Sequence, residues 1–389
     1  MLDVLIAGAG PAGCMAAVVL ARTGARVLVV DRARFPRHKL CGDTLNPGAL
    51  ALLAHVGLGT VAGTGVPLDG MMVTGPSGAR IIGDYGGGVA GRALPRAVLD
   101  ARLVDEAVRA GAQVREGVRV VEPLYDESGP RTQVRGAVLD VEGRRVRIPA
   151  LVTIAADGRR SALGIATGLL QHPARPRRWA VGAYYADVAA LQSRGEMHIR
   201  QGHYLGIAPL PDGIANVCFV SALREGFDAP EALLSRAIAS DRQLRERFAS
   251  ARRVSAVTVV GPLAVDASAA GMPGLLLAGD AAGFVDPMTG DGMRLALHGG
   301  KLAAEVALEM LMSPSLAGHL LLSGRRAEAF GRKLGVNRRL RTFVDHPALV
   351  GVGAVIAHAA PAAIHRLIAY AGDTTLAGAG AWTTASPRG

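Results

Sequence analysis

Three short segments, far apart in the chain, carry the residue types that bind a dinucleotide cofactor. The first is the glycine-rich run at residues 8–13, the second is Asp157-Gly158 and the third is Gly279-Asp280. Glycines let the backbone approach phosphate groups, and carboxylates at strand ends accept hydrogen bonds from sugar hydroxyls. In this order and at these separations, the three segments together predict a binding site for a flavin, FAD.

The first segment has the context that a phosphate site needs. The apolar residues 4–7 predict a buried parallel strand, residues 15–22 a helix and residues 25–30 the next strand. Within the turn, Gly8 permits the tight bend, Gly10 lets the backbone approach the pyrophosphate, and Gly13 lets helix and strand pack closely. Taken alone, this unit fits an NAD-binding domain equally well.

Further cofactor contacts are expected around this unit. Asp31 ends the second strand, where a carboxylate takes a ribose hydroxyl pair. A basic loop at residues 34–43 is expected to wrap around the nucleotide, and Arg96 is either a cofactor contact or a surface arginine. The predicted FAD contacts in this half of the chain are Gly8, Gly10, Pro11, Ala12, Gly13, Asp31, Arg32, Cys41, Gly42 and Arg96.

The second and third segments each follow an apolar run. Residues 150–155 lead to Asp157, and residues 275–278 lead to Asp280, which suits a ribityl hydroxyl. A helix at about residues 292–312 would point its N-terminus at the flavin ring and stabilise negative charge there. The predicted FAD contacts in this half are Asp157, Gly279, Asp280, Pro287, Gly290, Gly292 and Met293.

Composition limits the classes of protein. The 389 residues are 50% hydrophobic and 19% charged, enough for two domains with a proper core. The formal net charge is +11, but the arginines are scattered along the sequence, so we expect no nucleic-acid partner. An anionic substrate or compositional bias explains the positive charge better. The three cysteines lack metal-ligand spacing, and no secretory signal opens the chain, so we expect a cytoplasmic protein without a metal site.

Residues 179–260 change to alternating strands, including a hairpin around the turn at residues 210–213. Such a sheet would roof the flavin and carry the pocket for a small apolar or aromatic substrate. His203 and Tyr204 are candidate catalytic acids or bases, with strand packing as the alternative. Residues 347–364 form an apolar stretch that is interrupted by His358 and Pro361. The stretch is too short to span a membrane. It fits a helix that covers the substrate cavity or lies against a membrane surface.

Together the motifs resemble the FAD-dependent aromatic hydroxylase superfamily, with the p-hydroxybenzoate hydroxylase fold. Residues 39–43 (Lys-Leu-Cys-Gly-Asp) and 283–292 look most like its geranylgeranyl reductase-like branch. In that branch the loop cysteine faces the flavin, which makes Cys41 the candidate reactive cysteine.

The resemblance implies an α/β fold: a Rossmann-like FAD-binding domain with an inserted antiparallel β-sheet substrate domain and a C-terminal helical region. The expected boundaries are residues 1–70, 91–175 and 261–345 for the FAD-binding domain, 71–90 and 176–260 for the substrate domain, and 346–389 for the C-terminal region.

The sequence also departs from that branch. Where the prenyl reductases carry Tyr-x-Trp-x-Phe-Pro, residues 204–209 place Gly206 and Ala208 at the Trp and Phe positions. Flavin halogenases carry Trp-x-Trp-x-Ile-Pro, and the only tryptophans here are Trp179 and Trp382, so halogenation is set aside. The favoured expectation is therefore an NAD(P)H-dependent flavoprotein monooxygenase that hydroxylates or epoxidises its substrate. The alternatives are a reductase that saturates C=C bonds of an isoprenoid or quinone lipid, and a non-catalytic flavin-binding protein.

Overall fold

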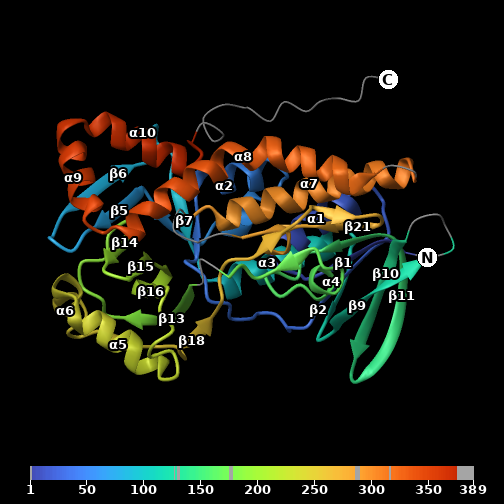
Figure 1. Ribbon diagram of the computed structural model, residues 1–389, viewed down its shortest axis with the longest axis horizontal. Coiled ribbons are helices and arrows are strands. Elements are labelled where there is room, and N and C mark those ends of the chain that lie inside the picture. Colours follow the sequence, from blue (N-terminus) through green and yellow to red (C-terminus); the bar gives the residue numbers. More distant parts are fainter. Residues whose placement is uncertain are drawn as a thin grey trace.

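The computed structural model describes residues 2–126, 128, 132–174, 178–284, 290–314 and 317–374, with residues 337–345 described by their backbone only. Figure 1 shows two lobes, each built on a β-sheet, with long helices along the top. The fold is mixed α/β, as expected from the sequence.

The first lobe contains an eight-stranded sheet with a parallel centre. Its central strands run in the order β21-β11-β1-β2-β8 and pair in parallel, because helices and long connections join them. The strands of this sheet are β1 (Leu2–Ala7), β2 (Val27–Asp31), β8 (Gln113–Glu116), β9 (Arg119–Asp126), β10 (Gln133–Val141), β11 (Arg144–Ala155), β20 (Gly271–Met272) and β21 (Leu275–Leu277).

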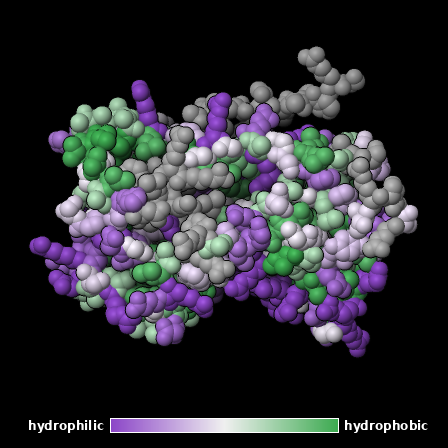
Figure 2. Space-filling view, viewed as in Figure 1, coloured by the Kyte–Doolittle hydropathy of each residue, from purple (hydrophilic) through white to green (hydrophobic). Residues whose placement is uncertain are grey.

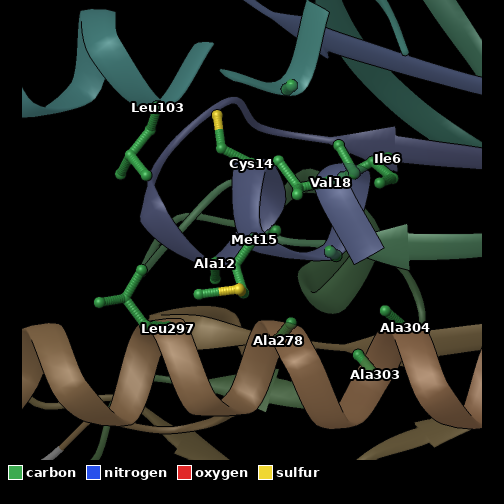
Figure 3. Close-up of a cluster of buried hydrophobic side chains, with 14 of the residues drawn as sticks. Ile6, Ala12, Cys14, Met15, Val18, Leu103, Ala278, Leu297, Ala303 and Ala304 are labelled. Carbon is green, nitrogen blue, oxygen red and sulfur yellow. The ribbon is translucent and has the colours of Figure 1, made fainter. Parts of the chain in front are cut away.

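Three helices pack together on one face of this sheet: α1 (Pro11–Ala21), α3 (Arg96–Arg109) and α7 (Gly292–Met312). Figure 3 shows Met15 of α1 directed toward α7, and Leu103 of α3 on the side of Cys14. A Cβ on Gly300 would lie 2.1 Å from the Ala12 carbonyl oxygen, so α1 and α7 can approach this closely only through glycine. Helix α1 begins at Pro11, four residues before the expected start, since proline suits the first helical position.

The second lobe contains a sheet in the order β17-β13-β16-β15-β14-β5-β6, with β18 beside β13. Its pairs are antiparallel except for β14 with β5. The strands are β5 (Gly70–Thr74), β6 (Arg80–Asp84), β13 (Trp179–Ala186), β14 (Arg194–Arg200), β15 (His203–Pro209), β16 (Ala215–Ser221), β17 (Arg252–Arg253) and β18 (Thr258–Val260).

Smaller elements connect and cover the two lobes. The minor strands are β3 (Thr44–Leu45), β4 (Val66–Leu68), β7 (Gly91–Ala93), β12 (Leu170–Gln171) and β19 (Asp266–Ala267). The other α-helices are α2 (Pro47–His55), α4 (Ala162–Ala166), α5 (Pro230–Ser240), α6 (Arg242–Arg247), α8 (Gly318–Asp345), α9 (Leu349–Ala359) and α10 (Pro361–Ala371), and the 3₁₀ helices are η1 (Gly59–Ala62), η2 (Pro211–Gly213) and η3 (Gly279–Ala282).

The C-terminal apolar stretch is not one helix. It forms α9 and α10, which meet at a break of 115° before Pro361, because proline cannot continue the preceding helix. Both helices pack against β6 of the second lobe (Figure 1). Among the described residues, no single helix has the length and apolar composition to cross a bilayer, and α9 with α10 meets that test only as a bent pair.

Candidate functional site

The first glycine segment packs against the second segment. Gly8 has φ +99°, and a Cβ there would lie 2.5 Å from the Ala156 carbonyl oxygen. A Cβ on Gly13 would lie 1.8 Å from the Gly8 carbonyl oxygen. Both positions therefore require glycine for packing inside the protein, whatever binds beside them.

Gly10 differs from its two neighbours in the motif. Its φ is −78°, which any residue adopts, and the nearest atom to an added Cβ is Arg37 Nη2 at 3.7 Å. Gly10, Pro11 and Ala12 line the cavity at the N-terminus of α1, where free backbone N–H groups favour anions. The space above Gly10 fits a phosphate group.

The acidic residue at the end of β2 has backbone partners. The two carboxylate oxygens of Asp31 accept hydrogen bonds from the Ala9 and Ala33 N–H groups, each at 2.8 Å. Each oxygen keeps a free lone pair, so a ribose hydroxyl can still bind. Neither Asp31 nor the exposed Arg32 is part of the cavity lining, so their contacts with FAD stay predictions.

The second and third segments lie side by side, because β11 and β21 are parallel neighbours whose carboxyl ends share one edge. Gly158, Gly279 and Asp280 line the cavity. Asp157 accepts a hydrogen bond from Ala162 N–H at 3.0 Å, and burial raises its pKa. Among the described residues, the other buried oxygen of Asp157 has no hydrogen-bond partner.

Three basic side chains line the same cavity: Lys39, Arg96 and Arg159. Burial lowers the pKa of Lys39 and of Arg159. Arg159 Nη1 is buried with no hydrogen-bond partner in the described part of the chain, and Arg159 Nε lies 3.8 Å from Asp280 Oδ2. Buried cations and unsatisfied donors around a glycine cradle fit the diphosphate of FAD and the negative charge of its reduced ring.

Arg96 is buried and lines the cavity, so it is not a surface arginine, and its contact with the cofactor stays a prediction. Its guanidinium makes two 2.8 Å hydrogen bonds to Asp100, and Asp100 also pairs with Arg37 at 3.1 Å. Burial opposes its charge, but Asp100 and the Cys41 side chain raise the pKa of Arg96. The half-buried Cys41 therefore presents its thiol to the cavity beside a fixed positive charge.

Next to Cys41, Asp43 is a buried carboxyl that ends the motif at residues 39–43 but was not among the predicted site residues. It accepts hydrogen bonds from Tyr184 Oη at 2.8 Å, Asn216 Nδ2 at 2.9 Å and Arg96 N–H at 3.2 Å. Asn216 also donates to the Cys41 carbonyl oxygen. Burial raises the pKa of Asp43 to about 7 despite these hydrogen bonds. Nothing in the local sequence points to Asn216, which comes from β16.

The N-terminus of α7 forms the far end of the cavity, lined by Gly290, Gly292 and Met293. Pro287, the remaining predicted contact here, lies outside the described residues. Asp291 is buried, accepts a hydrogen bond from Asn46 Nδ2 at 2.9 Å and pairs with Lys333 at 3.3 Å.

Lys333, on α8, extends this network to the end of α10. Its ammonium pairs with Asp373 at 3.0 Å and donates to the Tyr370 and Ala371 carbonyl oxygens. The C-terminal helices are thus attached to the start of α7 by buried charges.

Strand β15 contributes the roof. Tyr204, Gly206 and Ala208 line the cavity, since alternate side chains on a strand share a face. His203 lies outside the lining: its ring centroid is 4.9 Å from that of Phe219, and its Nδ1 lies 3.1 Å from the Gln201 carbonyl oxygen. The candidate His203 thus does not reach the site, whereas Tyr204 does.

Residues 1–307 match the family model described as FAD binding domain. Menaquinone reductase of Mycolicibacterium smegmatis is 32% identical over 91% of this chain and 87% of that protein. Digeranylgeranylglycerophospholipid reductase of Methanosarcina acetivorans is 29% identical over 80% of this chain and 76% of its own. A geranylgeranyl bacteriochlorophyll reductase-like structure from Thermoplasma acidophilum shares the fold, with a TM-score of 0.71, 23% identity and coverage of 96% of this chain and 91% of that one.

Proposed function

This chain belongs to the FAD-binding domain family, in its geranylgeranyl reductase-like branch, and on that premise we propose that it is an FAD-dependent reductase that saturates a C=C bond of an isoprenoid or quinone lipid. One observation carries the proposal: a single cavity combines the glycine and aspartate segments with an apolar roof. The roof residues in that lining include Ala180, Met197, Tyr204, Gly206, Ala208, Val220 and Leu263.

The cavity residues divide into a cofactor set and a substrate set. We assign the diphosphate to the N-terminus of α1 around Gly10, the ribityl chain to Asp280, and the ring to the N-terminus of α7 at Gly292. The positive end of α7 and the buried Arg159 favour negative charge at that ring. A lipid chain would lie along the apolar roof, which excludes water from the reacting bond.

Saturation of a C=C bond adds a hydride to one carbon and a proton to the other. FAD, when bound and reduced by NAD(P)H, supplies the hydride. The proton comes from a group of the chain, and Cys41 Sγ is our first candidate, because the guanidinium of Arg96 balances the charge left on sulfur. Tyr204 Oη is the second candidate, since Tyr204 lines the roof.

The sequence favoured a monooxygenase, which stays a prediction. The reductase alternative has the better support, because the two curated relatives described above are named as reductases and align with most of this chain. Both activities use the same cavity, so the decisive difference is the fate of the reducing equivalents: transfer to carbon or to oxygen.

The test uses the FAD-loaded protein, reduced with dithionite without oxygen and mixed with menaquinone or with a geranylgeranyl lipid. With excess dithionite removed before mixing, we expect flavin reoxidation at the rate of product formation and a product that remains two mass units heavier after air returns any quinol to the quinone, because a saturated C=C bond is not reoxidised. A product that forms only with oxygen and gains an oxygen atom would replace the proposal with the monooxygenase. Failure of every substrate under both conditions, with FAD bound, would favour the non-catalytic protein.

The proton donor is tested with matched cysteine variants. Cys41→Ser should keep FAD binding and lower the rate of lipid reduction by about 10²- to 10⁴-fold, the usual contribution of a general acid. Cys218→Ser is the control, because Cys218 lines the same cavity but burial raises its pKa well above the ordinary range. If Cys41→Ser retains the full rate and Tyr204→Phe loses it, tyrosine is the donor.

A further inference from the structure

Helices α9 and α10 are apolar on both of their sides. One side of α9 is buried, with Val350 fully inaccessible, while Val352, Val355 and Ile356 on the opposite side are 56%, 69% and 50% exposed. Leu367 and Tyr370 continue the exposed face on α10. Figure 2 shows hydrophobic residues gathered at the upper left, where Figure 1 has α9 and α10. A soluble helix normally turns a polar face to water, whereas these two expose large apolar side chains beside a few polar ones.

Within residues 346–372 the only side chain with a full charge at pH 7 is Arg366, and the acidic Asp84, whose N–H donates to His365 Nδ1 at 3.3 Å, lies outside this stretch on β6. The described residues 346–372 include no aspartate or glutamate, and they include Arg366, with His346, His358 and His365. All four of these basic side chains are exposed. The whole chain carries a formal charge of +11. A surface that combines exposed aliphatic side chains with an excess of basic groups is complementary to anionic lipid headgroups over an acyl layer.

The buried side of the same helices reaches the cavity wall. Val350 packs in one cluster with Met197, Tyr204 and Val220, which line the cavity. An added Cβ on Gly75 would lie 3.0 Å from Val350, so α9 fits closely over the edge of the sheet. Val350 therefore links the buried side of α9 to side chains of the cavity wall.

We propose that the exposed face of α9 and α10 docks on an anionic lipid bilayer, with both helices lying in the headgroup region and their apolar side chains in the acyl layer. This inference goes beyond the proposed reductase function, because it concerns where the protein works and holds for any apolar substrate. The 115° bend suits the role, since two short helices can lie against a surface without crossing it.

The test is co-sedimentation of the full FAD-loaded chain with vesicles of phosphatidylglycerol and phosphatidylcholine (1:1), and with pure phosphatidylcholine. We expect binding to the mixed vesicles, which weakens at high salt and on pure phosphatidylcholine. Val355→Asp should reduce vesicle binding by about tenfold or more, because it places a charge in the acyl layer and repels the anionic headgroups.

Leu320→Asp is the matched control. Leu320 is 64% exposed and helical, but it lies at the start of α8, whose 28 residues extend about 42 Å before α9 begins. This control should bind vesicles as the wild type does. FAD content and thermal unfolding of both variants confirm that each remains folded.

Three results would overturn the proposal. The wild type does not bind mixed vesicles; Val355→Asp and Leu320→Asp bind equally well; or light scattering shows that the wild type is a dimer that Val355→Asp dissociates. The last result would assign the face to a second copy of the chain.

Discussion

Gly10 and Gly13 belong to one motif, but the structure gives a different physical reason for glycine at each position. Alanine substitution at each position distinguishes the two reasons. At Gly13 an added Cβ meets the Gly8 carbonyl oxygen at 1.8 Å, so something in the fold must shift. At Gly10 the nearest protein atom lies at 3.7 Å and φ is −78°, so alanine fits the protein. Only the cofactor would meet the methyl group at Gly10.

The magnitudes follow from these contacts. Gly10→Ala loses a good N-cap residue, which costs up to about 1 kcal/mol, and gains about 0.4–1 kcal/mol from a less flexible unfolded chain. The free energy of unfolding of the apoprotein should therefore change by less than about 1 kcal/mol. Crowding the diphosphate should cost about 1–3 kcal/mol, so the Kd for FAD rises about 5- to 150-fold. Gly13→Ala should destabilise the apoprotein itself by about 3 kcal/mol or more.

The assay pairs urea unfolding of each apoprotein with a fluorescence titration of FAD. Gly24→Ala serves as a control, because Gly24 has φ +86° with nothing within 4 Å of an added Cβ, and so it reports backbone strain alone. If Gly10→Ala binds FAD as tightly as the wild type, the diphosphate does not approach Gly10, and the assignment of this end of the cavity is refuted.

Three further predictions concern the buried groups around the cavity. The pKa of Asp43 is about 7 in the folded protein, above its unfolded value, so the folded state binds one more proton between these two values. The free energy of unfolding should therefore fall as pH rises from about 4 through 7. Urea unfolding at pH 5, 6, 7 and 8 should show a smaller decrease for Asp43→Asn than for the wild type. At Gly206 no atom lies nearer than 4.0 Å to an added Cβ, so Gly206→Trp should change the affinity for FAD by no more than about twofold. In steady-state kinetics it should raise KM for a long lipid by about tenfold. An unchanged KM would show that the substrate does not pass along the roof. Lys333→Met removes the cation that Asp291 and Asp373 share, although Arg294 still pairs with Asp373 at 2.8 Å, and should cost about 3 kcal/mol in thermal unfolding. An unchanged Tm would show that the ion network contributes little.

Local patterns were enough to predict the cofactor fold. A strand, a glycine turn and a helix are neighbours in sequence, so residues 4–30 show the βαβ unit directly. The carboxyl ends of parallel strands share one sheet edge, which is why two apolar runs, each followed by an aspartate, were enough to group Asp157 with Asp280. The start of α1 was misplaced by four residues, because the turn glycines concealed that the helix begins at the proline.

By itself, the sequence determined the cofactor class, the two-lobed α/β architecture and the branch of the family, since these depend on contiguous residues and strand order. Only the tertiary structure decided which face of β15 is inside, because a two-residue period shows that His203 and Tyr204 differ but not which one meets the cavity. It alone joined Asp43 to Asn216, 173 residues away, and Lys333 to Asp291 on another helix. Such pairs arise from packing between distant elements, which no local sequence pattern records.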